Sequence, residues 1–286
     1  MTTLEVPLSD RCQRIRALTC ALIYHAGSGH PGGSLSCVDL LTWLWNDCFA
    51  DDPPGAELGD QFILSKGHAC PALYAVGQHF GLLPMSEMTQ LRALGSKLQG
   101  HPHVADLPWV GTSTGSLGQG FSVAVGRALG LRVQEDEGRT YVLLGDGELQ
   151  EGECWEAAMS AAHFGLDHLT AIVDYNGLQS DDSNANIMGL EPLTDKWQSF
   201  GWKVLVIDGH DLDQIEAAFA TARTHQGQPT VLIANTTKGK GVSYMEDSPL
   251  WHGSVKLRDE EFATALGELG ISADEIPSWI DGSVFA

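Results

Sequence analysis

The stretch LLGDGELQEGECWEA, residues 143–157, contains the transition that decides the fold. An apolar run that begins at Tyr141 predicts a buried strand, which breaks abruptly into Gly145-Asp146-Gly147 before a segment of helical character. Glycines at such a point let the backbone approach a ligand, and the start of a helix favours anions. The single carboxylate between the two glycines therefore raises the question of what it binds.

Four further apolar runs predict buried strands, at residues 62–64, 170–173, 204–207 and 230–234. Between the strands, three segments have apolar residues on one helical face: Phe121, Val125, Ala128 and Leu129; Trp155, Met159, Ala162 and Leu166; and Ile215, Phe219 and Ala222. This alternation predicts an α/β fold, a doubly wound and mostly parallel sheet with helices on both faces. Ligands of such sheets bind at the carboxyl ends of the strands. We expect a single domain over residues 1–270 and a tail at 271–286.

The composition excludes several classes of partner. The 286 residues carry a formal net charge of -21, whereas nucleic acids and anionic membrane surfaces require a basic face. No apolar run approaches the ~18 residues of a membrane span, and the polar, acidic residues 1–10 do not resemble a signal peptide. Six cysteines without a CxxC pair or a disulfide pattern are typical of buried thiols in a reducing compartment. We therefore expect a cytoplasmic protein.

Asp146 would repel a phosphate group bound at the same turn. At ~4 Å and an effective dielectric constant of ~20, each pair of unit charges costs about 4 kcal/mol. A divalent cation between the two groups reverses the sign, and Mg²⁺ takes one or two oxygen ligands from protein and others from phosphates. Asn176 is an oxygen donor at the end of the next predicted strand, thirty residues after Asp146. The sequence thus predicts a metal site at this edge of the sheet, with an ordinary turn as the alternative.

A second glycine-rich run, Gly115-Ser116-Leu117-Gly118-Gln119-Gly120, opens a predicted helix. Its spacing is not GxGxxG, and neither is the spacing around residues 145–147, so a nicotinamide cofactor is weakly supported. Close packing of the helix is the alternative explanation for these glycines.

Four histidines lie in glycine- or proline-rich loops rather than in periodic segments: His30, His68, His101 and His252. Histidines in such loops favour ligand binding or proton transfer. Zinc is a competing interpretation for His101 and His103, but the chain has no HExxH motif and no paired cysteines.

Together these features make the chain resemble transketolase, and more narrowly the thiamin-diphosphate-binding N-terminal part of that family. The matching stretches run in family order over nearly the whole chain: AGSGHPGGSLS (26–36), ILSKGHAC (63–70), LQGHPH (98–103), TSTGSLGQG (112–120), GDGELQEG (145–152), VDYNGLQ (173–179) and TTKGKGVSYMEDSPLWHG (236–253). None of these motifs is specific by itself, but the set is.

The resemblance implies thiamin diphosphate as cofactor, with Asp146, Asn176 and the carbonyl of Leu178 holding Mg²⁺ or Ca²⁺ against its diphosphate. The cofactor-binding positions that it implies are His68, Gly115, Ser116, Leu117, Gly145, Asp146, Gly147, Glu148, Asn176, Lys238 and His252. His30, His101 and His252 match positions that contact the donor ketose and the reacting oxygen. Glu151 matches a carboxylate at the subunit interface that relays to the partner's activating glutamate.

The resemblance also implies an activity and a partner. Transketolases transfer a two-carbon glycolaldehyde unit from a ketose, here expected to be a phosphate, to an aldose. The family's pyrimidine-binding and C-terminal domains have no counterpart in these 286 residues. We therefore expect the N-terminal subunit of a split transketolase, active with a C-terminal subunit in an α2β2 heterotetramer.

Three alternatives remain open at this point. The cofactor-binding subunit of a thiamin-dependent 2-oxo-acid dehydrogenase would share the GDG turn and the asparagine, but would not need the loop histidines. A specialised transketolase relative would act on an unusual ketose or a biosynthetic acceptor. A cofactor-binding protein without activity is disfavoured, because the full set of polar residues is present.

Overall fold

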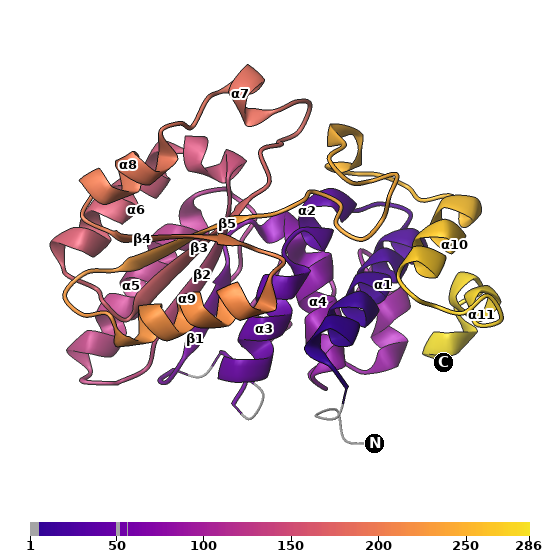
Figure 1. Ribbon diagram of the computed structural model, residues 1–286. Coiled ribbons are helices and arrows are strands. Elements are labelled where there is room, and N and C mark those ends of the chain that lie inside the picture. The colour runs from indigo at the N-terminus through magenta and orange to yellow at the C-terminus, as the bar shows by residue number, and fades with distance from the viewer. Residues whose placement is uncertain (1–5, 50–51, 56) are drawn as a thin grey trace. The chain divides into compact units, whose positions relative to one another are not determined.

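The computed structural model describes residues 6–49, 52–55 and 57–286 (Figure 1). Of the polar residues 1–10, the first five therefore lie outside the described part. The chain divides into two compact units. Unit 1 comprises Met1–Asp47, His68–Gly100 and Thr237–Ala286, and unit 2 comprises Cys48–Gly67 and His101–Thr236.

Unit 2 contains a five-stranded sheet in which every strand pair is parallel, with the order β1-β2-β3-β5-β4. The strands are β1 (Gln61–Leu64), β2 (Thr140–Gly145), β3 (Leu169–Tyr175), β4 (Lys203–Asp208) and β5 (Thr230–Asn235). All five lie where the sequence predicts them and extend by one or two residues beyond the predicted runs. The central strands β2 and β3 are buried along nearly their whole length, which explains their continuous apolar sequence.

Helices cover both faces of this sheet, which confirms the predicted fold class (Figure 1). On one face, α5 (Gln119–Val133), α6 (Gly152–His163) and α8 (Leu193–Ser199) bury a common core with the strands. On the other face lies α9 (Leu212–Thr224), where the Phe219 ring packs 5.9 Å from that of Tyr141. A single turn, α7 (Asn184–Ile187), follows β3, and short 3-10 helices η4 (Pro108–Val110) and η5 (Gly147–Gln150) complete the unit.

The predicted face of α9 is buried, and so is that of α5 except for the half-buried Leu129. The predicted face of α6 is wrong at one position. Met159 is 57% exposed. The residues of α6 that enter the core are small ones: Cys154, Ala157, Ala158 and Ala161. Their size lets the helix approach the sheet closely, and this outweighs the larger apolar area of Met159.

Unit 1 is helical. It contains α1 (Leu8–Ala26), α2 (Pro31–Leu35), most of α3 (Val38–Cys48), α4 (Cys70–His79), α10 (Asp259–Glu268) and α11 (Ile276–Ile280), with 3-10 turns η2 (Gly67–Ala69), η3 (Met85–Thr89), η6 (Pro249–Trp251) and η7 (Ser283–Phe285). None of the described helices has the length and apolarity needed to cross a membrane.

Residues 271–286, expected to be a tail, are folded as part of unit 1. Trp279 of α11 is fully buried and Phe285 is 2% exposed, with their ring centroids 5.4 Å apart. The guanidinium of Arg14 lies 4.4 Å from the centre of the Trp279 ring. Two aromatic side chains thus attach a short segment that lacks the long periodic pattern of a core helix.

Trp279→Ala should therefore lower the free energy of unfolding by about 3–5 kcal/mol, as expected for loss of a buried tryptophan. Met159→Ala is the control, and its exposed side chain should change stability by about 0.5 kcal/mol or less. Urea denaturation of both variants measures the difference. Equal effects would contradict the packed C-terminal segment.

Candidate functional site at the carboxyl edge of β2 and β3, and a histidine cluster

Asp146 lies directly after β2 and is 2% exposed. One carboxylate oxygen, Oδ1, accepts a hydrogen bond from the backbone N–H of Gly147 at 2.7 Å. The other, Oδ2, accepts from the N–H of Gly177 at 2.6 Å. Gly177 adopts φ +74°, a conformation that favours glycine. The carboxylate is thus held between two glycine turns, one after each of two neighbouring strands.

Asn176 follows β3, which pairs with β2 in a register that sets Gly145 opposite Asp174. This register brings the Asp146 and Asn176 turns together, as the sequence predicts. The Asn176 Oδ1 accepts from the N–H of Leu178 at 3.2 Å, and its Nδ2 donates to Asp174 Oδ2 at 3.3 Å. The amide is therefore oriented by one contact on each side.

A buried ionic network lies next to Asn176. Lys66 and Asp174 form an ion pair with side-chain exposures of 2% and 0%. The other Asp174 oxygen accepts from the Thr236 hydroxyl. Such a pair is strongly coupled, because removing one partner leaves an uncompensated buried charge. The network fixes the carboxylate that orients Asn176.

Glu148 is buried and its carboxylate is directed to protein donors. Oε1 accepts from the Ser65 hydroxyl at 2.5 Å and from the N–H of Gly118 at 2.9 Å, and Oε2 accepts from the N–H of Gly145 at 3.0 Å. Burial raises the pKa of this carboxyl, against the lowering effect of these hydrogen bonds. Glu148 therefore joins the ends of β1 and β2 to the start of α5.

The loop before α5 contacts His101. Gly115 has φ +143°, and a Cβ at this position would stand 3.0 Å from the His101 ring. The His101 side chain is exposed and packs over the glycine, so the structure brings these two predicted site residues together. Ser116 is exposed and Leu117 half-buried in the same loop.

Unit 1 gathers the other three loop histidines into one cluster. The ring centroids of His30 and His68 are 5.3 Å apart, those of His68 and His252 are 5.5 Å apart, and those of His30 and His252 are 5.9 Å apart. They come from three separate segments: the residue before α2, the turn η2, and the residue after η6. The sequence predicts each histidine, and the structure unites them.

Lys238 joins this cluster and is 1% exposed. Its Nζ lies 2.8 Å from Nδ1 of His252. Because an ammonium group can only donate, Nδ1 accepts and a neutral His252 ring carries its proton on Nε2.

Gly253 is essential to the packing of the cluster, since a Cβ there would stand 2.6 Å from the His30 ring. Gly32 is similarly close to Lys238, whose Cγ would lie 3.0 Å from an added Cβ. Such short distances force the histidine or the lysine to move. Four functional candidates are not predicted from the sequence: Gly32, Gly253, Lys66 and Asp174. Gly253 could have been found, because it directly follows His252.

Glu151 is exposed at the residue that precedes α6. Its side chain makes no capping hydrogen bond to that helix. The charged group is thus presented to solvent rather than to the oxygen ligands around Asp146.

The residues around Asp146 fit a hard divalent cation. They offer one carboxylate, the Asn176 amide oxygen and the Leu178 carbonyl, and such a set leaves further positions for phosphate oxygens. In the described part of the chain, no group of three or more His, Cys, Asp and Glu side chains is arranged to hold a metal ion. His103, the partner of His101 in the zinc alternative, instead pairs with Asp106 at 2.8 Å.

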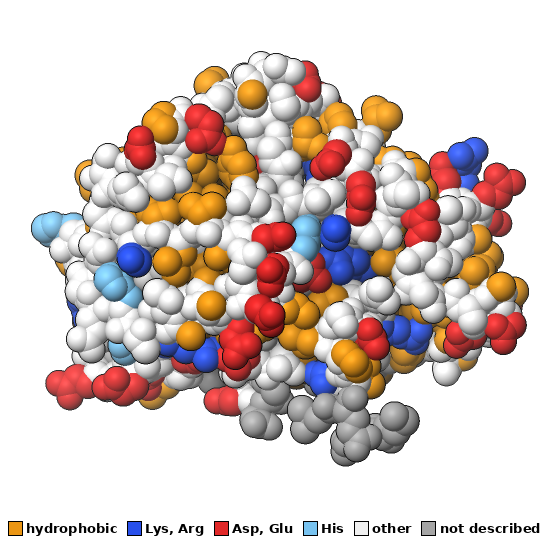
Figure 2. Space-filling view, viewed as in Figure 1, with side chains coloured by type: hydrophobic (Ala, Val, Ile, Leu, Met, Phe, Trp, Pro, Cys, Tyr) orange, Lys and Arg blue, Asp and Glu red, His pale blue; other side chains and the backbone are white. Residues whose placement is uncertain are grey.

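The acidic surface of the protein affects the binding of an anionic ligand. Figure 2 shows acidic side chains spread over the visible face, in keeping with 37 acidic and 16 basic residues. An anionic ligand would therefore meet an unfavourable field, which a cation bound beside it would reduce.

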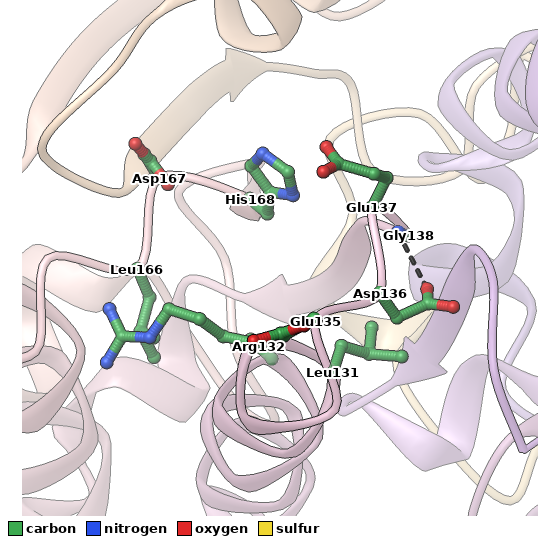
Figure 3. Close-up of a pocket in the computed structure, with 10 residues that line it drawn as sticks. Leu131, Arg132, Glu135, Asp136, Glu137, Gly138, Leu166, Asp167 and His168 are labelled. Carbon is green, nitrogen blue, oxygen red and sulfur yellow. Dashed lines mark hydrogen bonds between the residues drawn. The ribbon is translucent and has the colours of Figure 1, made fainter.

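A separate hollow of about 280 Å³ lies at the opposite, amino-terminal edge of the sheet in unit 2 (Figure 3). Arg132, Asp136 and His168 line it, and Asp136 accepts a hydrogen bond from Gly138. None of the predicted site residues is part of this lining. Because parallel sheets bind ligands at their carboxyl edge, we assign the functional site to the Asp146 edge.

Comparison with known proteins gives one consistent result. The family model described as "Transketolase, thiamine diphosphate binding domain" matches residues 9–280. The 6-deoxy-6-sulfo-D-fructose transketolase subunit SqwG of Clostridium sp. (strain MSTE9) is 42% identical over 271 residues, which cover 94% of this chain and 98% of that protein. An apulose-4-phosphate transketolase subunit of Phocaeicola vulgatus is 40% identical, with 92% and 93% covered.

Longer relatives match over part of their length. Human transketolase is 38% identical over 249 residues, covering 86% of this chain and 39% of the human protein. Among solved structures, transketolase from Leishmania mexicana superposes with a TM-score of 0.83 at 28% identity, covering 97% of this chain and 44% of that one. The Campylobacter jejuni enzyme gives 0.82 at 28%, with 97% and 46% covered. The chain thus spans less than half the length of these proteins.

Lys66→Met should lower the free energy of unfolding by about 3–5 kcal/mol, because it leaves Asp174 as an unpaired buried charge. Adding Asp174→Asn should recover part of this loss. Arg258→Met, which removes an exposed ion pair to Glu261, is the control and should have a much smaller effect. Urea denaturation measures these three variants and Asp174→Asn alone, and a double variant as unstable as the sum of the two single ones would refute the pairing.

Proposed function

The chain belongs to the transketolase family, as a transketolase-type N-terminal subunit with a thiamine diphosphate binding domain, and from this we propose that it takes part in moving a two-carbon glycolaldehyde unit from a ketose to an aldose. The observation that carries the proposal is the pairing of the Asp146 and Asn176 turns at neighbouring strand ends. When bound, thiamin diphosphate supplies the carbon nucleophile for cleavage next to the ketose carbonyl.

In our proposal Asp146, Asn176 and the Leu178 carbonyl hold Mg²⁺, or Ca²⁺, against the diphosphate. The hard oxygen donors support this assignment. The orientation of Asn176 by Asp174 supports it further, because an amide that donates to a carboxylate through Nδ2 leaves its oxygen for other contacts.

The remaining cofactor contacts are assigned to His68, Lys238 and the backbone at Gly115, Gly147 and their neighbours Ser116, Leu117 and Gly145. The glycines allow close approach of a ligand to the backbone. Glu148, expected to bind the cofactor, acts in our proposal through the hydrogen bonds by which it holds Gly118 and Gly145 in place.

We assign proton transfer with the donor sugar to His30 and His252, and a contact with its hydroxyls to His101. Imidazoles with a pKa near 6.5 exchange protons with alkoxides at neutral pH. The contact from Lys238 makes His252 a proton donor in our proposal, because the proton of the neutral ring then lies on Nε2 of His252.

We further propose that the active enzyme contains a separate C-terminal subunit with the pyrimidine-binding domain, in an α2β2 heterotetramer. Two relatives that match over nearly their whole length are themselves named as subunits. The exposed carboxylate of Glu151 is available to such a partner, in the relay that the resemblance implies.

The substrate in our proposal is an unusual ketose with an anionic group. The names of the two relatives describe a sulfonated sugar and a sugar phosphate. With a net charge of -21 on this chain, basic residues for that group would come from the partner. The comparisons favour a transketolase-type subunit over a 2-oxo-acid dehydrogenase subunit.

We also propose that residues 1–270 act as one diphosphate-binding domain and that the protein works in the cytoplasm. The six cysteines, all in the described part of the chain, form no disulfide, which suits a reducing compartment. Burial raises the pKa of Cys12, Cys20 and Cys70 to about 12, so these thiols stay protonated and inert.

Asp146→Ala should abolish metal-dependent binding of thiamin diphosphate, lowering affinity by about 100-fold or more, because the cation loses its only charged protein ligand in the proposed set. Asn176→Ala should weaken binding less. Asp182→Ala, an exposed acid in the same loop, is the control and should bind normally. Calorimetry with Mg²⁺, with circular dichroism to verify folding, measures this; unchanged affinity in Asp146→Ala would refute the metal site.

The chain by itself should not catalyse transfer, with rates about 100-fold or more below those of the complex, because the acid–base group that activates the cofactor comes from the partner. A coupled assay compares the chain alone with the co-expressed pair. The donors are 6-deoxy-6-sulfofructose, apulose 4-phosphate, fructose 6-phosphate and xylulose 5-phosphate. Light scattering gives the mass of the complex. Full activity of the isolated chain would overturn the two-subunit proposal.

A further inference from the structure

Asn184 is a buried amide whose hydrogen-bonding capacity is unused. Only 5% of the residue is exposed, yet neither its Oδ1 nor its Nδ2 has a partner among the described residues. Leaving both a donor and an acceptor unsatisfied is unfavourable, and buried amides in native proteins are rarely left in that state. The position therefore points to a ligand group that completes it.

The position of Asn184 indicates which end of the cofactor it would contact. Its backbone N–H donates to the carbonyl of Gly177 at 2.9 Å, and Gly177 in turn donates to Asp146. Its Oδ1 lies 3.8 Å from the point where a Cβ at Gly147 would stand. The amide thus lies beside Gly147 of the GDG turn, on the side where a Cβ would stand.

The backbone around Asn184 is firmly held. Leu178 forms an antiparallel bridge with Ser183, and the Ser183 hydroxyl accepts from the N–H of Asn186. On the same side of Gly147, where an added Cβ would stand 3.1 Å from the Cβ of Gln179, the Gln179 amide oxygen accepts from Gln150 at 2.5 Å. Among these polar side chains, that of Asn184 has neither its amide oxygen nor its amide nitrogen in a hydrogen bond with the described residues.

We infer that Asn184 is a further binding residue for the diphosphate end of the cofactor, with its amide paired to phosphate oxygens and to water on the metal ion. An amide presents one donor and one acceptor group, which suits the phosphate and metal-bound water together, since Mg²⁺ usually keeps several waters. Being neutral, it adds a donor beside Asp146 without adding to the repulsion of the phosphate. The inference rests on the proposed function of the Asp146 turn.

The test uses a substitution with opposite expected effects on stability and on binding. Asn184→Leu keeps the number of side-chain heavy atoms and the branch at Cγ, and it removes both unsatisfied groups. It should raise the midpoint of thermal unfolding of the ligand-free chain, by about 2 °C or more. It should also lower the affinity for Mg²⁺-pyrophosphate and for Mg²⁺-thiamin diphosphate by the same factor, about tenfold or more. Calorimetry and thermal unfolding on the full chain measure both quantities.

Two further variants sharpen the test. Asn184→Ala should lose the same affinity as Asn184→Leu, which separates a lost contact from a steric effect of the leucine. Asn186→Ala removes an exposed amide from the same helical turn and should leave both affinities unchanged.

The possible results are distinct. Affinities unchanged in Asn184→Leu, with or without a gain in stability, would overturn the inference and leave the proposed function intact. A loss confined to thiamin diphosphate would overturn the assignment to the diphosphate end. If the unmodified chain binds neither probe with Mg²⁺, both by itself and in complex with its co-expressed C-terminal subunit, the proposed function fails and the inference fails with it.

Discussion

The parallel pairing of β2 with β3 is the constraint on which the candidate site depends. Its register sets Gly145 opposite Asp174, so the two residues that follow the strand ends, Asp146 and Asn176, belong to adjoining turns. A shift by one residue would point each of these side chains to the other face of the sheet. The apolar cores on both faces hold that register, and so the packing of the sheet determines the geometry of the oxygen ligands.

Much of this arrangement is readable from the sequence. The apolar runs of β1, β2, β3 and β5 are buried because both faces of the sheet are covered there, and short runs of this kind are easily recognised. β4, at the edge of the sheet, has the same kind of run, but its Val206 is 55% exposed, so the prediction of a buried strand is wrong for this one. The turns after β2 and β3 are expected to adjoin, because carboxyl ends of neighbouring parallel strands share one edge. The loop histidines stand out by their glycine-rich surroundings, although only the folded unit 1 shows that His30, His68 and His252 are neighbours.

Other features depend on contacts that a linear reading does not reveal. Lys66 and Asp174 are 108 positions apart, and neither is unusual in its local sequence. On α6, apolar size favours Met159 as a core residue, whereas the closeness of helix and sheet selects alanines. Asn184 begins the short turn α7 in a polar stretch of sequence, and nothing in that stretch indicates that this amide is buried without a hydrogen-bond partner among the described residues. In each case tertiary packing, rather than composition, decides the role of the residue.

The close approach of Gly253 to His30 affects how mutational scans of this protein should be interpreted. A Cβ at Gly253 would collide with the ring of an intact histidine that lies far earlier in the chain. A substitution there would therefore be recorded as a defect in proton transfer, although no proton-carrying group had been altered. A glycine can in this way imitate a catalytic residue in a genetic screen, and only the geometry of its neighbour distinguishes the two.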